Sequence, residues 1–487
     1  MLSFKSSLKI LIFLCFVFIG LAFLFYKTET NIELQIKKIF PKNLKNAIKS
    51  TIFIIPEKNQ EIAYLKKKIM SIKTEKNYEI KELKEKILDI KYSDSIIDLE
   101  DSYVTLFNYY SNNLKKLKAK KNETIINKIK GSNLQFDFYS IDNLFNGKHS
   151  TANATIYLEY KDKNVILVTG DGHFFYFNKN KLKNDLIEFT KIKTNIHDII
   201  TDIDFLTKSK IGIKDILIDG DNILITFPLK KKEDCYSFSI FRSKFNLDYI
   251  KFNKIYEIKP CVNRKESNHF GGRIKVLNEN NYIFTTGDYG NSKFSQSTKN
   301  LYGKIIKINK VNNQTELISL GHRNPQGLYI DNEKGKILST EHGPTGGDEI
   351  NMIDLKNNEI KNFGWPNSSY GIDQGATWKR NHINYGYIEP IKYYVPSIAI
   401  SEIIKVPQNF FKSDNNFFVA SMGGIPDGGY QSIHYINLDE NYQKINDERI
   451  IKINDRVRDL INLNEEDIVL GSTEISPGIF KISIAKN

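Results

Sequence analysis

Residues Gly321–Asn351 read GHRNPQGLYIDNEKGKILSTEHGPTGGDEIN, and residues 362–366 follow as NFGWP. Gly327–Ile330 and Ile337–Thr340 are predicted strands, and the turn Asn332–Gly335 joins them. The flanking loops are dense in Gly, Pro, His, Arg and acidic residues. Gly and Pro fix unusual backbone geometry, and charged groups packed between them are often held for binding. The alternative is a pair of tight turns that only cap a β-sheet.

Three motifs in this region, GHRNPQGL, EHGPTGGDEIN and NFGWP, resemble in order and spacing the soluble glucose dehydrogenase and aldose sugar dehydrogenase family. Weaker resemblance runs from about Gly131 to the C-terminus, and the first 130 residues fall outside it. Members of that family are six-bladed β-propellers that use pyrroloquinoline quinone (PQQ) with Ca²⁺. The resemblance therefore implies an all-β, six-bladed propeller over residues 131–487.

From about Gly131 onward, apolar residues alternate with polar ones, which is typical of strands. Thr155–Tyr160, Val165–Thr169 and Phe174–Asn178 are predicted strands separated by short turns. Many short strands with regular turns predict a sandwich, a barrel or a propeller. Composition does not choose among these folds; the family resemblance favours the propeller.

An apolar run of 17 residues, Ile10–Tyr26, lies near the N-terminus. This length is at the short end for a membrane-spanning helix. Lys5 and Lys9 precede it, and no small-residue cleavage site follows, so we predict an uncleaved signal anchor within residues 1–30. A cleaved signal peptide is the alternative. The anchor implies a single-pass inner-membrane protein with its propeller in the periplasm.

Residues 31–130 are predicted to form a helical stalk that is partly similar to a coiled coil. Apolar residues are spaced by three and four at Ile62, Leu65, Ile69 and Ile72, and the same spacing recurs from Ile80 to Ile90. This is a short, interrupted heptad pattern. Self-association through the stalk and packing of a helix against its own chain both fit it.

The formal net charge of +13 is concentrated at the N-terminal end. Residues 1–130 contain 25 Lys and 14 acidic residues, which gives +11, whereas the remaining 45 basic and 43 acidic residues give +2. A propeller that binds nucleic acid would carry the basic excess itself. We therefore expect no nucleic-acid partner.

Cys235 and Cys261 flank a strand-rich region. In an exported domain they can form a disulfide. Spacing in sequence does not give the distance between the Cα atoms, so two unpaired thiols fit equally well.

The segment His269–Ile274 has the sequence HFGGRI. In the resembled family a segment of this type lies on the central face, and its arginine helps to polarise the substrate or the quinone. The resemblance implies a catalytic role for Arg273 and a cofactor contact for His269. A fixed guanidinium can stabilise oxyanion charge on a reducing quinone. Hydrogen bonds from Arg273 to neighbouring carbonyls are the alternative.

Further cofactor contacts are implied in two motifs. Arg323, Asn324 and Gln326 in GHRNPQG offer a guanidinium and two amides, which suit a carboxylated planar cofactor or a sugar. Arg456 and Arg458 belong to RVRD, which resembles the closing blade of the family. Alternatively, the GHRNPQG residues hold the loops between blades in place, and the RVRD arginines form salt bridges between blades.

Two loops offer oxygen ligands of the kind that Ca²⁺ prefers. The first contains Gly287, Asp288 and Gly290, and the second contains Asp348 and Glu349. Gly-Asp turns are common, so the pattern is weak as a metal signal by itself.

The sequence departs from the family at the catalytic base, which must take the proton of the sugar hydroxyl. The family uses a histidine in a segment of the type GLLGIAxHP. The best match here, Gly212–Gly220, has Asp219 at that position, so Asp219 is the predicted base. A carboxylate with a pKa of about 4 is a weaker base unless burial raises that pKa.

A second departure lies in the loop Ala420–Gly424, where the family usually has one or two basic residues and this chain has none. PQQ carries three carboxylates, so fewer cations should weaken its binding.

Two functions follow from these patterns. The first is a membrane-anchored, PQQ-dependent aldose dehydrogenase that passes electrons from a sugar to a respiratory acceptor. The second is a non-catalytic propeller that binds glycans or proteins after losing its base and its cofactor contacts.

Overall fold

The computed structural model describes residues 117–142, 144, 154–200, 202, 205, 211–232, 235–263, 268–357, 359–371, 379–423, 431–463 and 467–486. The predicted membrane anchor and the predicted stalk up to residue 116 lie outside these residues. Among the described helices, none is long and apolar enough to cross a membrane.

The described strands form six sheets, each with its strands hydrogen-bonded in order from the innermost strand outward. One sheet consists of β3 (Ile156–Lys161), β4 (Asn164–Thr169), β5 (Phe174–Asn178), β7 (Thr190–Thr194) and β11 (Tyr249–Ile250). The next consists of β8 (Asp215–Asp219), β9 (Asn222–Lys232), β10 (Cys235–Lys244) and β12 (Asn253–Glu257), and β13 (Val262–Asn263) also pairs with β10. The third consists of β14 (Gly271–Asn278), β15 (Asn281–Thr286), β16 (Lys304–Asn309), β17 (Thr315–Leu320) and β21 (Lys361–Asn362).

The remaining three sheets complete the set. The fourth consists of β18 (Pro325–Asp331), β19 (Lys336–Glu341), β20 (Asp348–Asp354) and β22 (Lys392–Tyr394). The fifth consists of β23 (Ile400–Lys405), β24 (Asn416–Met422), β25 (Gln431–Leu438) and β26 (Ile445–Lys452). The sixth consists of β27 (Val457–Leu463), β28 (Ile468–Thr473), β29 (Gly478–Ile484), β2 (Ser132–Ile141), β1 (Lys118–Ile129) and β6 (Leu186–Glu188). Short helices in the loops are η3 (Lys179–Lys183), α7 (Ile196–Ile199), α9 (Lys293–Gln296), η4 (His382–Tyr385) and η5 (Gln408–Phe410).

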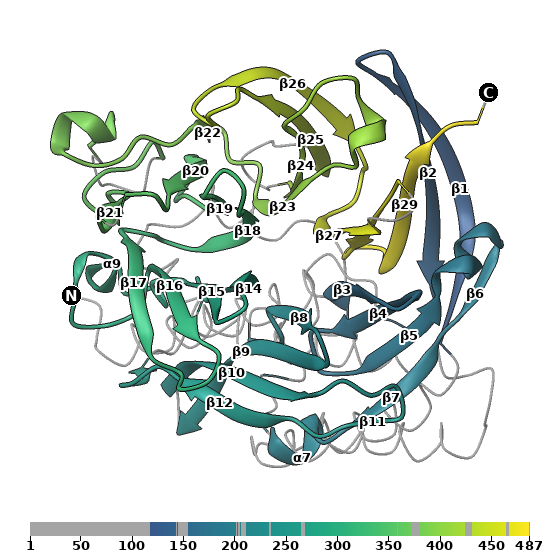
Figure 1. The fold of residues 1–487 in the computed structure, drawn as a ribbon, viewed down its shortest axis with the longest axis horizontal. Helices are drawn as coiled ribbons and strands as arrows, with labels where there is room; N and C mark the ends of the chain where they lie inside the picture. Colours follow the sequence, from purple (N-terminus) through teal and green to yellow (C-terminus); the bar gives the residue numbers. More distant parts are fainter. Residues whose placement is uncertain are drawn as a thin grey trace, which may run out of the picture. The chain divides into compact units, whose positions relative to one another are not determined.

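The six innermost strands form a closed ring (Figure 1). Going around the ring, β3 contacts β8, β8 contacts β14, β14 contacts β18, β18 contacts β23, β23 contacts β27, and β27 contacts β3 again. Each sheet extends outward from this ring as one blade. The prediction of an all-β, six-bladed propeller is therefore confirmed.

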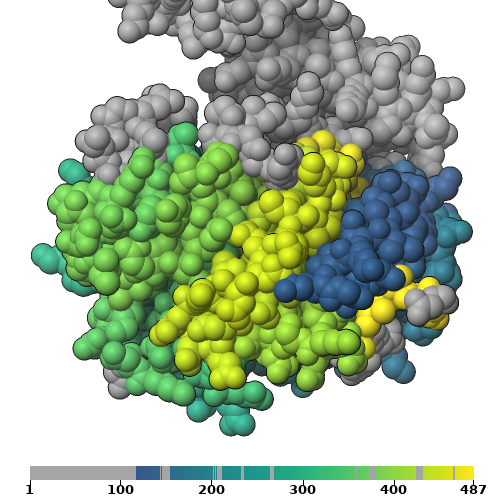
Figure 2. Space-filling model, turned by 90° about the horizontal axis from the view of Figure 1, so that it is seen from above, coloured from purple at the N-terminus to yellow at the C-terminus, as the bar shows by residue number. Residues whose placement is uncertain are grey.

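The last sheet joins the two ends of the described chain. Strand β2 pairs with β29 in antiparallel register, from Leu134↔Ile484 to Ser140↔Gly478. Figure 2 shows these N-terminal strands, in blue, beside the C-terminal strands, in yellow. The pairing closes the ring with hydrogen bonds between the first and last blade segments.

Strand β1 corrects the predicted boundary between stalk and propeller. Residues 118–129 were expected to be helical, but they pair with β2 from Ala119↔Ile141 to Ile129↔Ser132. This strand has few apolar residues, and its buried positions, Ala119 and Ile129, stand at its two ends. The sequence therefore shows little alternation there, and the strand is fixed by its long-range pairing. Residues 118–129 therefore belong to a propeller sheet, although they precede the predicted boundary at residue 131.

The two strands predicted beside the GHRNPQG motif lie where the pattern placed them. Gly327–Ile330 falls within β18 and Ile337–Thr340 within β19, with Leu328 opposite Ser339. The apolar residues of such strands pack between neighbouring blades. For example, Phe238 of β10 stacks on Phe284 of β15 at a centroid distance of 4.9 Å. Each such buried phenylalanine contributes about 1.5–3 kcal/mol to stability.

Cys235 and Cys261 form a disulfide with a Cα–Cα distance of 5.6 Å. Cys235 opens β10, and Cys261 directly precedes β13, which pairs with β10. The sheet therefore brings together two cysteines that are 26 residues apart in sequence.

Candidate functional site

The innermost strands begin at the same end of the ring. Arg273, third in β14, has its Nη1 3.0 Å from Asp215, first in β8, and 2.7 Å from Asp459, third in β27. Residues that precede or open the innermost strands therefore gather at one end of the propeller. We call this the arginine end, and it contains Lys214, His269, Arg323, Asn324, Gln326, Arg456 and Arg458.

A buried carboxylate fixes two of the predicted cofactor-binding arginines. Nε of Arg456 donates to Glu474 at 3.0 Å, and Nε of Arg458 donates to the other oxygen of the same carboxylate. Burial alone would raise the pKa of Glu474, but the charges of Arg458 and Arg456 outweigh it and lower that pKa to about 2. Glu474 is therefore ionised and holds both guanidinium groups in place.

Arg323 is held by the loop that follows β19 and by an aromatic ring. Its Nη1 donates to the carbonyl of His342 at 3.2 Å, and its guanidinium carbon lies 5.3 Å from the ring centroid of Trp365. The backbone N–H of Arg323 donates to Glu341 at 3.0 Å. The cation–π contact with Trp365 adds to these hydrogen bonds in holding the third guanidinium.

The two predicted amides link the start of β18 to the starts of β14 and β27. Asn324 Oδ1 accepts from the backbone N–H of Gly271 at 3.1 Å and from Gln326 Nε2 at 2.9 Å. Gln326 Oε1 in turn accepts from Arg458 Nη1 at 3.3 Å. The structure thus brings the predicted cofactor-binding residues of GHRNPQG and RVRD together at one end of the ring.

His269 is paired with a buried carboxylate. Its Nδ1 lies 2.9 Å from Asp288 Oδ1, and Asp288 is 1% exposed. Asp288 also accepts from Trp365 Nε1 at 2.8 Å and from the backbone N–H of Gly290 at 2.6 Å. When Asp288 accepts the Nδ1 proton, the lone pair of the neutral imidazole is on Nε2. This is the arrangement of a general base that is oriented by an acid.

His342 belongs to the arginine end as well, although the sequence did not single it out. Burial, followed by the charges of Arg323, Arg458 and Arg456, lowers its pKa to about 3. Its Nε2 is buried and has no hydrogen-bond partner among the described residues. The imidazole is therefore neutral and suited to hydrogen bonding with a ligand. Its place in the EHGPTGGDEIN motif is the signal that could have identified it.

Lys214 is the second residue of this end that was missed from the sequence. It is buried directly before β8, and burial, followed by the charge of Arg458, lowers its pKa well below the usual value. Gly272 makes room for it, because a Cβ on Gly272, where φ is +118°, would lie 2.3 Å from Lys214 Cβ. A glycine is therefore needed at this position of the HFGGRI segment.

Asp219, the predicted base, lies at the opposite end of β8. Four residue steps along a strand separate it from Asp215 by about 13 Å. Its carboxylate accepts from Lys310 Nζ at 2.7 Å and from Tyr282 OH at 2.8 Å. Burial opposes but does not cancel these contacts, which lower the pKa of Asp219. The structure therefore does not bring Asp219 to the arginine end, and its lowered pKa makes it a weak base.

Arg273, the other predicted catalytic residue, is buried beneath the arginine end, with 3% of its side chain exposed. Besides Asp215 and Asp459, its Nη1 lies 3.1 Å from Glu402 Oε2. These carboxylates and two backbone carbonyls surround the guanidinium. The expectation that Arg273 reaches the substrate or the quinone does not agree with these contacts.

The side chains predicted as calcium ligands accept hydrogen bonds from other protein groups. Both oxygens of Asp288 accept the hydrogen bonds described above. Asp348 accepts from Gly343 N, Ser397 Oγ, Ile398 N and Ile400 N. Glu349 accepts from Asn351 Nδ2 at 3.2 Å.

The carbonyl of Gly287 accepts from Gly303 N, and the N–H of Gly290 donates to Asp288. Within the described residues there is no group of three or more His, Cys, Asp or Glu side chains that could hold a metal ion. The predicted carboxylates therefore do not fit a calcium site as the structure places them.

The arginine end, by contrast, fits a polycarboxylate. Three guanidinium groups gather there, Arg323 from the start of the β18 blade and Arg456 and Arg458 from the start of the β27 blade, and Glu474 pairs with two of them. The sequence Ala420–Gly424 contains no basic residue, and the carbonyls of Met422 and Gly423 lie 3.4 and 3.5 Å from Arg456 Nη1. Arg456 thus places a cation beside this loop.

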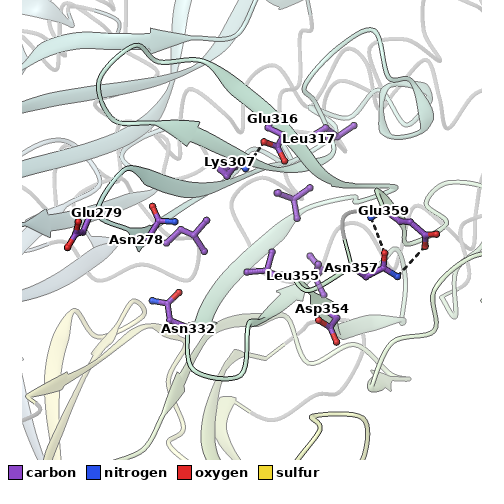
Figure 3. A pocket seen from close by; sticks show the side chains of 13 residues that line it. Asn278, Glu279, Lys307, Glu316, Leu317, Asn332, Asp354, Leu355, Asn357 and Glu359 are labelled. Carbon is purple, nitrogen blue, oxygen red and sulfur yellow. Dashed lines mark hydrogen bonds and ion pairs between the residues drawn. The ribbon is translucent and has the colours of Figure 1, made fainter.

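A separate cavity of about 580 Å³ lies between the blades of β14 and β18 (Figure 3). Its lining includes Leu277 near the end of β14, Glu279 directly after β14 and Asn332 directly after β18. These positions are at the C-terminal ends of the innermost strands. The cavity is therefore not part of the arginine end.

Comparison with known proteins agrees with the fold and the motifs. Residues 158–478 match the family model described as Glucose / Sorbosone dehydrogenase. The aldose sugar dehydrogenase YliI of Escherichia coli strain K12 is 29% identical over 180 residues, which cover 34% of this chain and 45% of that protein. The chain spans half or less of the length of the curated relatives that it matches.

Two solved structures share the propeller. The apo-form of the soluble aldose sugar dehydrogenase from Escherichia coli superposes with a TM-score of 0.56 at 16% identity, covering 72% of this chain and 100% of that one. The PQQ-bound form of an aldose sugar dehydrogenase from Streptomyces coelicolor gives a TM-score of 0.51 at 15% identity, covering 75% of this chain and 100% of that one. Since the family match spans more than half of its residues, this chain belongs to the glucose/sorbosone dehydrogenase family of quinoprotein sugar dehydrogenases.

Proposed function

We propose that this protein is a PQQ-dependent aldose dehydrogenase whose cofactor and sugar bind at the arginine end. The observation that carries the proposal is the meeting of three fixed guanidinium groups with the His269–Asp288 pair at one end of the propeller. Arg323, Arg456 and Arg458 would hold the carboxylates of PQQ by charge-assisted hydrogen bonds. When bound, PQQ supplies the acceptor for the hydride from the sugar.

His269 is the general base of this proposal, in place of Asp219. Its Nε2 would take the proton of the sugar hydroxyl while Asp288 stabilises the resulting imidazolium. His342 stays neutral because burial, and then the charges of the surrounding arginines, lower its pKa, so it would orient a ligand by hydrogen bonding. In this proposal His269 transfers the proton, and His342 only orients the ligand.

The location of the protein is also a proposal. The apolar run Ile10–Tyr26 would anchor the chain in the inner membrane with the propeller in the periplasm, next to a respiratory electron acceptor. The disulfide between Cys235 and Cys261 supports an oxidising compartment. Carbonate-washed membranes should retain the full-length protein. Recovery of a soluble form that begins near residue 28 would contradict the anchor.

The enzymatic proposal is tested with the full-length protein in detergent. PQQ is titrated with and without added Ca²⁺, and binding is followed by absorbance, after which a panel of aldoses is assayed with a redox dye. We expect saturable PQQ binding and dye reduction that requires both PQQ and sugar. A folded protein that binds no PQQ under either condition would refute the proposal and favour a non-catalytic propeller.

A further inference from the structure

Arg273 contacts the innermost strand of each of the other five blades. Its Nη1 lies 3.0 Å from Asp215 of β8, 3.1 Å from Glu402 of β23 and 2.7 Å from Asp459 of β27. Its Nε donates to a carbonyl of β18, and its guanidinium carbon lies 5.3 Å from the ring centroid of Tyr157 in β3. A single side chain on β14 therefore ties the centre of the whole ring together.

Two of these contacts go to the backbone of residues at the arginine end. Nε of Arg273 donates to the carbonyl of Gln326 at 2.6 Å, and Nη2 donates to the carbonyl of Arg458 at 3.2 Å. The side chains of Gln326 and Arg458 also meet directly, at 3.3 Å. One rigid guanidinium holds both carbonyls. It therefore sets the distance between β18 and β27 at Gln326 and Arg458, whose side chains belong to the arginine end.

The chemistry of this position requires the shape of arginine. The planar guanidinium presents its donors in fixed directions, and the named contacts use Nε, Nη1 and Nη2 together. A lysine has one ammonium group and cannot reach Gln326 and Arg458 at the same time as the carboxylates. Lys275, whose Nζ lies 3.5 Å from Glu402, already supplies a second cation. The geometry of Arg273, and not its charge alone, therefore matters here.

We propose that Arg273 is a positioning residue. It holds Gln326 and Arg458 at the spacing that cofactor binding at the arginine end requires, and it does not itself touch the ligand. The inference rests on the proposed function, because that spacing matters for activity only if PQQ binds at the arginine end. It assigns to the HFGGRI arginine a role beneath the site instead of within it.

The test compares the full-length wild type with Arg273→Lys, which keeps the charge, and with Arg273→Gln, which keeps a planar donor, in case one of them fails to fold. Asp137→Asn is the matched control. Asp137 is also buried and accepts from Lys121 and Lys481, but it lies in β2, within the closing sheet and away from the arginine end. Melting temperature, a crystal structure without cofactor and the PQQ dissociation constant are measured for each protein.

We expect Arg273→Lys to lose the contact between Arg458 Nη1 and Gln326 Oε1 in the crystal and to weaken PQQ binding tenfold or more. Asp137→Asn should lower the melting temperature and leave PQQ affinity unchanged. A retained Arg458–Gln326 contact in the variant would overturn the inference, and so would a lost contact with wild-type affinity and wild-type KM. If the wild type binds no PQQ, the proposed function fails, and the crystal geometry alone then decides whether Arg273 positions the two residues.

Discussion

Asp288 holds the imidazole of His269 through a contact of 2.9 Å between Oδ1 and Nδ1, across 19 residues of sequence. His269 itself has a φ of +61°, a conformation that is uncommon for a residue other than glycine. The strained backbone and the buried acid together fix the direction of the ring. Such strain is stored mainly where a side chain must be held for function.

Asp288→Asn is predicted to slow sugar oxidation by about 10²–10⁴-fold, because an amide does not stabilise the imidazolium that a base forms. PQQ affinity should change little. Asp219→Asn is the control: it removes a carboxylate at the far end of β8 and should leave the rate unchanged. The assay is steady-state dye reduction at saturating PQQ. The opposite pattern, with a slow Asp219→Asn and a normal Asp288→Asn, would restore Asp219 as the base.

Arg458→Met is predicted to weaken PQQ binding about 10–100-fold, since a hydrogen bond to a charged group contributes roughly 1.5–3 kcal/mol. Arg449→Ala is the matched control, because Arg449 is 61% exposed and pairs with Asp447 at 3.3 Å, away from the arginine end. Both proteins are compared by absorbance titration with PQQ. Equal affinities for the two variants would show that Arg458 does not hold the cofactor.

Glu474→Gln is predicted to reduce the dependence of stability on acid pH. The pKa of Glu474 is about 2 in the folded protein and 4.5 as the ordinary value. A carboxyl with a lowered folded-state pKa stabilises the protein above pH 4.5, and this stabilisation is lost as the pH falls from 4.5 through about 2. The shift corresponds to about 3 kcal/mol.

Urea unfolding of both proteins between about pH 2.5 and pH 7 measures this effect. The variant should be less stable at neutral pH, and the difference should shrink as the pH falls. A difference that stays constant over that range would contradict the role of Glu474 as the buried counter-charge.

Removal of β1 is predicted to destabilise the propeller. A chain that begins at residue 117 keeps β1, and one that begins at residue 131 loses its pairing with β2 and the buried Ile129. Burial of one isoleucine contributes about 1.5–3 kcal/mol, before the lost hydrogen bonds are added. Circular dichroism melts of the two chains should differ by several degrees. Equal melting temperatures would mean that β1 is not part of the folded unit.

The sequence motifs located most of the arginine end, for a physical reason. Arg323, Asn324, Gln326 and Arg458 stand directly before or within short strands, and the ring brings the beginnings of those strands together. The order and spacing of the motifs were enough to predict the propeller. The family resemblance then implied that these residues contact the cofactor.

Other candidate residues have side-chain partners that the sequence does not show. Asp219 and Arg273 were chosen by their position in a motif, yet Lys310 and Asp459, 91 and 186 residues further along, decide what they do. Asp348 was a candidate calcium ligand, but its oxygens accept four hydrogen bonds from nearby loops. Only the folded structure shows that these polar groups are already occupied.

The central claim is that His269 is the base of a PQQ-dependent sugar oxidation at the arginine end. Its most direct test is the single-turnover reduction of bound PQQ by an aldose, followed by absorbance in wild type and in His269→Gln. We predict that the variant binds PQQ within a few-fold of wild type and is reduced about 10²–10⁴-fold more slowly. Reduction of the His269→Gln protein at the wild-type rate would contradict this account.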